Sequence, residues 1–289
     1  MVKIWIFLSE EHALENRLNE LNGSQWLYWT NSIYETSYPP DRTHHLRKKH
    51  GAMKPPQLMA EIISFFTKKG ELVLDPFAGV GGTLLGAELA GRRAFGIELN
   101  PLWVEIYRRI TAEYREFNGE LVPAAEAGLN GRLLASEMLS GDCLDLMKQF
   151  DAGSFAAIIA DPPYGCNHGS TGFKKETNFN MNSYDRRDLG NSRDYQEFLS
   201  KIEAFGKEAF RLLLPMRYLV LLIGDRYHHG EYLPLGYMVA ESLRETGFRW
   251  KGTRIWWNKA TQRRLKPYAI NSCFIPNITH QNILILRKE

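Results

Sequence analysis

The chain has 289 residues, 44% of them hydrophobic, and this length suits one large α/β domain with its own core. The chain has three widely spaced cysteines, Cys143, Cys166 and Cys273, which argue against a disulfide framework and against a zinc-binding CxxC pair. No apolar run has membrane-spanning length, so we expect a cytoplasmic protein. The net charge of +3 is small, but basic residues gather in residues 41–54 and 258–268, which fits a polyanionic partner as well as it fits a solvated surface.

Apolar runs and helical periodicity alternate along most of the chain. Seven runs predict β-strands: residues 71–75, 93–98, 132 to about 141, 155–161, 217–225, 248–257 and 282–288. Helical spacing predicts the main helices: residues 83–90, 101–117, 194–213 and 232–247. This alternation is typical of a mostly parallel sheet with helices on both faces, and the two last strands, with no helix between them, indicate an antiparallel edge strand.

Three segments stand outside this alternation. Residues 116–131 suggest a surface loop or a short helical excursion. Residues 165–193 are polar and rich in Gly, Asn and Ser, and a structureless connection of this length inside a compact domain usually serves a function. The aromatic run WLYWTNSIY, residues 26–34, fits base stacking, but packing of an N-terminal arm onto the sheet is the favoured interpretation.

The first predicted strand leads into a glycine-rich turn, DPFAGVGGT (75–83). Ligands of parallel sheets lie beyond the carboxyl ends of the strands, and Gly79, Gly81 and Gly82 would let the backbone approach such a ligand closely. Glu98 ends the next strand, about 20 residues further on, where an acid can accept the two hydroxyls of a ribose. The spacing matches neither GxGxxG nor a phosphate-binding P-loop, which favours a nucleoside cofactor without a pyrophosphate.

Four motifs in a consistent order carry a family resemblance. DPFAGVGGT, GRRAFGIELNP, GDCLDL and DPPY resemble the S-adenosylmethionine-dependent amino-methyltransferases, specifically the DNA adenine-N6/cytosine-N4 methylase family. KPPQLMAEII (54–63) resembles the segment before the glycine loop of those enzymes, and IWWNK and HQNILILRK resemble their final strands. The resemblance therefore covers about residues 50–289.

The resemblance implies an α/β class I methyltransferase fold, which is Rossmann-like, with a mostly parallel seven-stranded sheet. It implies a single methyltransferase domain over residues 1–289, made of an N-terminal arm (1–50), a cofactor-binding half (51–150) and a catalytic half (151–289). It also implies a set of side chains and loop residues that hold S-adenosylmethionine. These are Asp75, Gly79, Gly81, Thr83 and Lys54 at the methionine end, Phe77 on the adenine ring, Glu98 at the ribose hydroxyls and Asp142 at the adenine amino group.

The same resemblance makes Asp161, Pro162, Pro163 and Tyr164 the catalytic motif. An exocyclic amine on a base is a poor nucleophile, because its lone pair is delocalised into the ring. If Asp161 and the Pro162 carbonyl accept its hydrogens, that lone pair can point at the sulfonium methyl group. The prolines would keep these acceptors rigidly placed, and Tyr164 would offer a face on which a flipped base stacks.

The chain departs from the family in carrying no large target-recognition segment. Base readout is therefore expected from the loops 165–193 and 258–280, from the N-terminal arm, or from a companion restriction or recognition subunit. The basic residues expected to contact nucleic acid are Lys174, Lys175, Arg186, Arg187, Arg263, Arg264 and Lys266. No metal site is expected, since His44, His45 and His50 have no cysteine or carboxylate at ligand spacing.

Four functions remain open on the sequence alone. Asp161 at the head of DPPY favours N6 of adenine in double-stranded DNA as the target, whereas Ser at that position more often accompanies N4 of cytosine. A tRNA guanosine-N2 methyltransferase is an alternative, because DPPYG also occurs in such enzymes, but the arm of about 50 residues is short for a separate RNA-binding domain. A non-catalytic nucleic-acid-binding subunit ranks lower, because every acidic and glycine position of the motifs is present.

Overall fold

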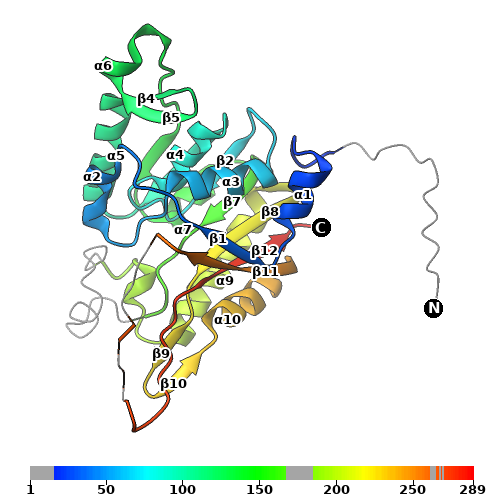
Figure 1. Cartoon of the computed structure of the whole chain (residues 1–289). Coiled ribbons are helices and arrows are strands. Elements are labelled where there is room, and N and C mark those ends of the chain that lie inside the picture. Colours follow the sequence, from blue (N-terminus) through cyan, green and yellow to red (C-terminus); the bar gives the residue numbers. More distant parts are fainter. Residues whose placement is uncertain (1–15, 167–184, 261–264, 267, 269) are drawn as a thin grey trace, which may run out of the picture.

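The computed structural model describes residues 16–166, 185–260, 265–266, 268 and 270–289. An eight-stranded sheet runs through its centre in the order β1-β11-β12-β8-β7-β2-β3-β6 (Figure 1). The strands are β1 (Ile33–Thr36), β2 (Leu72–Asp75), β3 (Arg93–Glu98), β6 (Glu137–Ser140), β7 (Phe155–Ala160), β8 (Leu213–Ile223), β11 (Arg249–Asn258) and β12 (Gln281–Arg287). Every neighbouring pair is parallel except the two made by β12, which runs antiparallel to β11 and β8.

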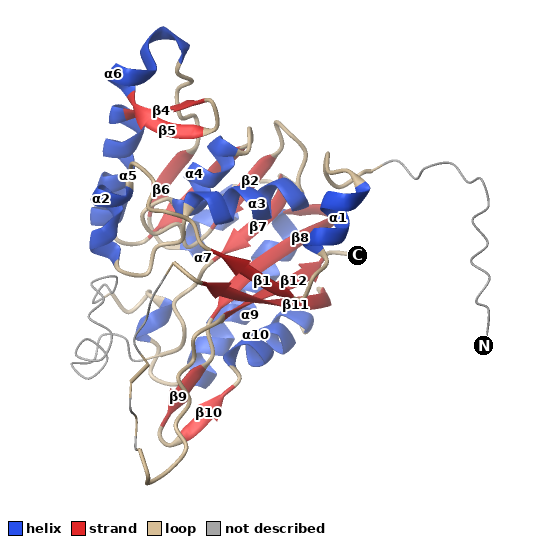
Figure 2. Ribbon diagram, viewed as in Figure 1, coloured by secondary structure: helices blue, strands red, loops and turns tan. Residues whose placement is uncertain are grey.

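Helices cover both faces of this sheet (Figure 2). One face carries α1 (Gly23–Trp29), α3 (Pro56–Phe66), α4 (Gly82–Leu89) and α5 (Pro101–Glu113), and the other carries α7 (Cys143–Leu146), α9 (Tyr195–Leu212) and α10 (Leu235–Arg244). Two further helices have only four residues each: α2 (His44–Arg47) and α6 (Ala124–Ala127). Within the described residues, no helix combines the length and the apolar character that a membrane span requires.

The central strand β7 shows how the sequence separates the two cores. Successive side chains of a strand point to opposite faces. Accordingly, Ala157 and Ile159 pack into the core beneath α3 and α4, whereas Ile158 and Ala160 pack into the core beneath α9. All six residues of β7 are buried, which is why the sequence reads as a continuous apolar run without alternation.

The fold class predicted from the sequence is confirmed, with two corrections to the sheet. The sheet has eight strands instead of seven, because β1 of the N-terminal arm pairs with β11 in parallel. The antiparallel strand β12 is not at an edge; it lies inside the sheet between β11 and β8. The chain between β11 and β12, residues 259–280, is long enough for β12 to return into the place between β11 and β8, and β1 is the edge strand on this side.

The segment 116–131 holds more structure than a surface loop. The strands β4 (Tyr114–Phe117) and β5 (Glu120–Pro123) form an antiparallel hairpin there, followed by α6. Asn118 and Gly119 make its two-residue turn with φ angles of 52° and 82°. Asn-Gly is the usual sequence of such a turn, so this dipeptide was an available sequence signal for a hairpin. A second hairpin is formed by β9 (Arg226–His228) and β10 (Glu231–Leu233).

Candidate active site

The predicted motifs meet at one edge of the sheet. The strands β7, β2, β3 and β6 are consecutive neighbours and run parallel, so their carboxyl ends lie side by side. Asp75 and Glu98 are the last residues of β2 and β3, whereas Asp142 and Asp161 follow the ends of β6 and β7. The strand pairing thus brings to one edge four acidic residues that lie up to 86 residues apart, from position 75 to position 161 of the sequence.

The glycine-rich loop after β2 is closely packed. Gly79 and Gly81 have φ angles of 51° and 80°, in the left-handed region that favours glycine. A Cβ atom at Gly81 would lie 2.2 Å from the ring of Tyr107, and one at Gly82 would lie 2.9 Å from the carbonyl oxygen of Lys54. Glycine at these positions therefore serves both the backbone conformation and the close approach of neighbouring segments.

Two carboxyl groups flank this loop, that of the buried Asp75 and that of the half-buried Glu98. Asp75 Oδ1 accepts a hydrogen bond from the Phe77 backbone N–H at 2.9 Å, and Glu98 accepts from the backbone N–H groups of Gly79 at 2.8 Å and Asn100 at 2.7 Å. Burial raises the pKa of Asp75 to about 7 and that of Glu98 to about 7, although these backbone hydrogen bonds act in the opposite direction. Strongly perturbed carboxyl groups in such a position mark a candidate ligand site.

The other expected cofactor residues lie around the same loop. Thr83 is buried in the first turn of α4, and its hydroxyl group hydrogen-bonds to Asp75. Phe77 is half-buried, with its ring centroid 5.2 Å from that of Phe205 on the α9 side of the sheet. Asp142 is half-buried and caps α7, where its Oδ1 accepts from the Leu144 N–H at 2.8 Å.

The DPPY motif forms a closed set of contacts with Lys54. Asp161 accepts from the Tyr164 hydroxyl at Oδ1, at 2.8 Å, and from Lys54 Nζ at Oδ2, at 2.5 Å. Lys54 Nζ also donates to the Tyr164 hydroxyl oxygen at 3.0 Å. Lys54 is buried, and its ammonium group contacts the DPPY motif.

Two residues of this region were not assigned a role from the sequence. Arg47 is buried, and it donates to the Lys54 carbonyl oxygen at 3.2 Å and to Thr43 Oγ1 at 2.9 Å. The His50 ring lies against Gly79, where a Cβ atom would be 3.2 Å from Nε2, and burial lowers the pKa of His50 to about 4. The basic run 41–54 was visible in the sequence, but its composition alone did not distinguish these two packed residues from solvated ones.

The three histidines considered for metal binding do not converge. His45 is exposed and its Nδ1 lies 3.1 Å from the Arg42 carbonyl oxygen, whereas His50 is directed at the glycine loop. In the part of the chain that the structure describes, no three His, Cys, Asp or Glu side chains are grouped closely enough to hold a metal ion.

Few of the expected nucleic-acid contacts fall on described residues. Lys174, Lys175, Arg263 and Arg264 lie outside the described residues. Arg186, Arg187 and Lys266 are exposed, and Arg187 forms an ion pair with Asp185 at 2.6 Å. Several large apolar side chains near Lys266 are also exposed: Leu265, Tyr268, Ile270 and Phe274. Their role in binding stays a prediction.

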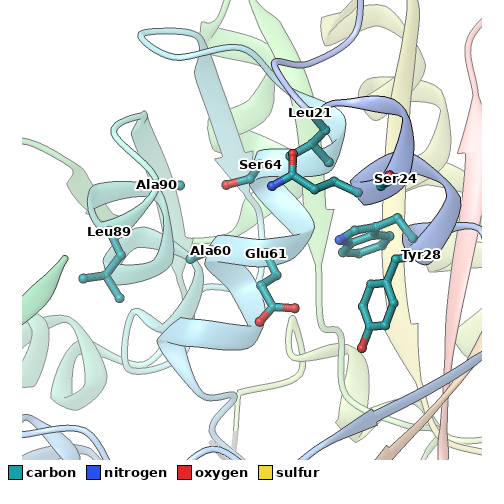
Figure 3. A pocket seen from close by; sticks show the side chains of 10 residues that line it. Leu21, Ser24, Tyr28, Ala60, Glu61, Ser64, Leu89 and Ala90 are labelled. Atoms are coloured by element: carbon teal, nitrogen blue, oxygen red, sulfur yellow. The ribbon is translucent and has the colours of Figure 1, made fainter.

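A hollow of about 580 Å³ lies away from this site, among α1, α3 and the end of α4 (Figure 3). Tyr28, Trp29 and Glu61 are among its lining residues, and the remaining ones are Leu21, Ser24, Gln25, Ala60, Ser64, Leu89 and Ala90. Since none of the four motifs contributes a lining residue, we place the candidate active site at the strand ends and not in this hollow.

Comparisons with known proteins find similarity to methyltransferases. Residues 7–109 match a family model described as DNA methylase. The Type II methyltransferase M2.DpnII of Streptococcus pneumoniae is 34% identical over 33% of this chain and 35% of its own length. A tRNA (guanine(10)-N2)-dimethyltransferase of Methanocaldococcus jannaschii is 28% identical over 44% of this chain and 34% of its own length. The chain thus spans about a third of the length of these curated relatives.

Among solved structures, TrmN from Thermus thermophilus resembles this fold with a TM-score of 0.51. The likeness covers 88% of this chain and 55% of that chain, at 17% sequence identity. At this level of identity, the likeness concerns the fold alone, and it supports the fold class predicted from the sequence.

Proposed function

Since residues 7–109 match a family model described as DNA methylase, we propose that this chain transfers a methyl group from S-adenosylmethionine to the exocyclic N6 of a flipped adenine in double-stranded DNA. The observation that carries the proposal is the adjacency of β2 and β7. Their parallel pairing puts the glycine loop after Asp75 beside the DPPY motif that begins at Asp161. Asp161 is also close enough to act electrostatically on Asp75.

The residues at this edge fit the proposed cofactor. Each oxygen of Glu98 accepts one backbone N–H, and because a carboxylate has about four lone-pair sites, it can also accept two ribose hydroxyls. Gly79 and Gly81 offer backbone without a Cβ atom to the methionine end, and Asp142 and Phe77 would contact the adenine. S-adenosylmethionine supplies an electrophilic methyl group at this site.

The chain's own catalytic contribution lies in Asp161 and its neighbours. The Asp161 carboxylate and the Pro162 carbonyl oxygen accept the hydrogens of the target amine, which turns its lone pair away from the ring. The prolines limit backbone motion at these acceptors. Tyr164 is half-buried at the end of the motif and gives the extruded base a stacking surface.

A guanosine-N2 methyltransferase acting on tRNA is the second candidate. Relatives named tRNA (guanine(10)-N2)-dimethyltransferase are 26 to 30% identical to this chain over 38 to 44% of its length. The exocyclic amine of guanine would meet the same Asp161 and Tyr164, so the catalytic motif by itself does not separate the two substrates. DNA is favoured because the family model that matches residues 7–109 is described as DNA methylase. Relatives named Type II methyltransferase also favour a role in restriction-modification.

The test is methyl transfer from labelled S-adenosylmethionine to unmethylated genomic DNA and, in parallel, to bulk tRNA, followed by nucleoside mass spectrometry. N6-methyladenine in DNA is the expected product. N4-methylcytosine in DNA would keep the site and change the target base, whereas N2-methylguanosine in RNA alone would overturn the DNA substrate. No label in either nucleic acid would overturn the proposed activity of the isolated chain and support a subunit that needs a partner.

A further inference from the structure

We propose that Lys54 is a positioning residue of the catalytic motif, which holds Asp161 and Tyr164 in place and ties them to the glycine loop. This inference rests on the function proposed above. The family resemblance of the segment 54–63 implies that Lys54 contacts the methionine carboxylate of the cofactor. The role proposed here is a different one. When Lys54 is replaced, a cofactor contact predicts a weaker affinity for S-adenosylmethionine, whereas a positioning role predicts an unchanged affinity.

The first argument is the geometry of the contact. Lys54 lies just before α3, 107 residues from Asp161 in the sequence. Its Nζ atom is 2.5 Å from Asp161 Oδ2 and 3.0 Å from the Tyr164 hydroxyl oxygen, and that hydroxyl is 2.8 Å from Asp161 Oδ1. Each of the three polar groups therefore contacts both of the others, so that none can move without breaking two interactions.

The second argument is burial. The side chain of Lys54 is 7% exposed and that of Asp161 is 19% exposed. A lysine on the surface gains little from an ion pair, because water screens the charges and the flexible side chain loses entropy. A buried ammonium group, in contrast, requires a partner and stays in one geometry. The Lys54–Asp161 contact is thus a fixed part of the site and not an adventitious surface pair.

The third argument concerns the backbone of Lys54. Its carbonyl oxygen accepts a hydrogen bond from the buried Arg47 guanidinium at 3.2 Å. The same oxygen packs against Gly82, at the start of α4, so closely that a Cβ atom on Gly82 would come within 2.9 Å of it. One residue therefore touches the end of the glycine loop with its backbone and the catalytic motif with its side chain.

These contacts determine what Lys54 contributes. With one donor on each oxygen, the Asp161 carboxylate cannot turn freely, and its remaining lone pairs keep fixed directions for the hydrogens of the target amine. The Tyr164 ring is likewise held at its hydroxyl end, which fixes the stacking surface. Loss of Lys54 is therefore expected to slow the reaction of bound substrates and to leave cofactor binding intact.

The test compares Lys54→Met with Lys207→Met. Lys207 is the matched control, because its Nζ lies 2.8 Å from Glu203 on the exposed surface of α9, with 64% of its side chain accessible. Methyl transfer is measured at saturating S-adenosylmethionine and DNA, and the cofactor Kd is measured by calorimetry. For Lys54→Met we expect kcat to fall about 100-fold, the effect of a misplaced catalytic group, with the cofactor Kd unchanged. Propylamine added to Lys54→Ala should restore part of kcat, and Lys207→Met should behave as wild type.

A second measurement does not depend on enzymatic activity, and its main comparison uses the wild-type protein. Acetylation of the wild-type protein with an N-hydroxysuccinimide ester, read residue by residue by mass spectrometry, reports how accessible each ammonium group is. We expect Lys54 to react far more slowly than Lys207, and Asp161→Asn to accelerate the reaction of Lys54. Equal reactivity of the two lysines in the wild-type protein would show that the contact is not held in solution.

The outcomes separate this inference from the proposed function. A weaker cofactor affinity with an unchanged kcat in Lys54→Met would overturn the inference and assign Lys54 to the cofactor. Unchanged values of both constants would also overturn it. If the wild-type protein methylates neither DNA nor RNA, the proposed function fails, and the acetylation result alone decides whether Lys54 holds the motif.

Discussion

Glu98 at the end of β3 binds the backbone of Gly79 in the glycine loop, with 2.8 Å between its Oε2 and the Gly79 nitrogen. Its other oxygen accepts from the Asn100 N–H at 2.7 Å. The same carboxylate therefore holds the loop in its left-handed turn, and in the proposed function it also accepts the ribose hydroxyls of the cofactor. This double role makes Glu98 a sensitive position for cofactor binding.

We expect Glu98→Gln to weaken the binding of S-adenosylmethionine by about 1.5 to 3 kcal/mol, the usual contribution of hydrogen bonds to a charged group. An amide keeps one acceptor oxygen and replaces the other with a donor, so one of its contacts to the loop or to the ribose is lost. Calorimetric titration measures the change in Kd. Glu137→Gln is the control, because this exposed carboxyl group lies on the neighbouring strand β6; equal effects of both substitutions would contradict a specific role for Glu98.

The raised pKa of Glu98 also predicts a dependence of stability on pH. Burial raises the pKa from 4.5 to about 7, so the folded protein binds this proton more tightly than the unfolded chain. The contribution to the free energy of unfolding is therefore fully present below pH 4.5 and is lost as the pH rises through about 7. In the ligand-free protein, the stability of wild type minus that of Glu98→Gln should fall over this window by up to about 3 kcal/mol. Urea unfolding at a series of pH values measures this difference, and a difference that stays constant would contradict the prediction.

Two glycines with nearly the same φ angle allow the cost of backbone strain to be compared with the cost of a steric clash. Gly81 and Gly119 have φ angles of 80° and 82°, but a Cβ atom would meet the Tyr107 ring at 2.2 Å in the first case and nothing within 4 Å in the second. Gly119→Ala should cost about 1 to 2 kcal/mol of stability, from the left-handed backbone alone, and should retain methyl transfer. Gly81→Ala should cost clearly more and should abolish cofactor binding. Thermal unfolding and cofactor titration of both variants provide the comparison; equal stability losses would show that Tyr107 yields without cost.

The residues at the strand ends were predictable because each motif is local in sequence. A short apolar run followed at once by Asp75 and glycines, or by Asp161 and prolines, carries both the strand and its end within a few residues. Once the sheet was predicted to be parallel, the four ends had to lie at one edge, and the structure places them there.

Contacts between distant segments were not predictable in this way. Lys54 and Asp161 are 107 residues apart, and nothing in either local sequence signals their contact. The strand β1 has only four residues, and its partner Ile255 lies 222 positions after Ile33, so its place in the sheet depends on tertiary packing. The internal place of β12 was missed for a related reason: the order of strands depends on the path of the connection 259–280, which periodicity does not reveal.

Asp161 provides the direct test of the catalytic motif. We expect Asp161→Asn and Asp161→Ala to lower kcat by at least about 100- to 1,000-fold, the scale of losing one preorganised electrostatic contact, while the Kd for S-adenosylmethionine stays near that of wild type. The reason is that Asp161 follows β7, whereas the expected cofactor contacts other than Lys54 lie at or after the ends of β2, β3 and β6. Asp151→Ala, an exposed carboxyl group before the same strand, is the control. Turnover of Asp161→Ala at the wild-type rate would rule out the mechanism.

Arg254 connects the N-terminal arm to the sheet, and we expect it to contribute to the stability of that attachment. This buried residue of β11 donates from Nε to the Asn31 carbonyl oxygen at 2.7 Å, and its guanidinium carbon lies 4.1 Å and 4.2 Å from the ring centroids of Trp29 and Tyr34. Arg254→Ala removes two desolvated cation–π contacts and one hydrogen bond, so we expect a loss of about 2 to 4 kcal/mol in the free energy of unfolding.

The matched control for this prediction is Arg249→Ala, because Arg249 lies on the same strand with 73% of its side chain exposed and pairs only at the surface with Glu289 among the described residues. Its substitution should change stability by less than about 0.5 kcal/mol. Urea unfolding of both variants, followed by tryptophan fluorescence, measures the difference, because Trp29 loses its neighbouring guanidinium only in Arg254→Ala. If the two variants unfold at the same urea concentration, the arm is held by the parallel pairing of β1 with β11 and by aromatic packing, and the arginine adds nothing to that attachment.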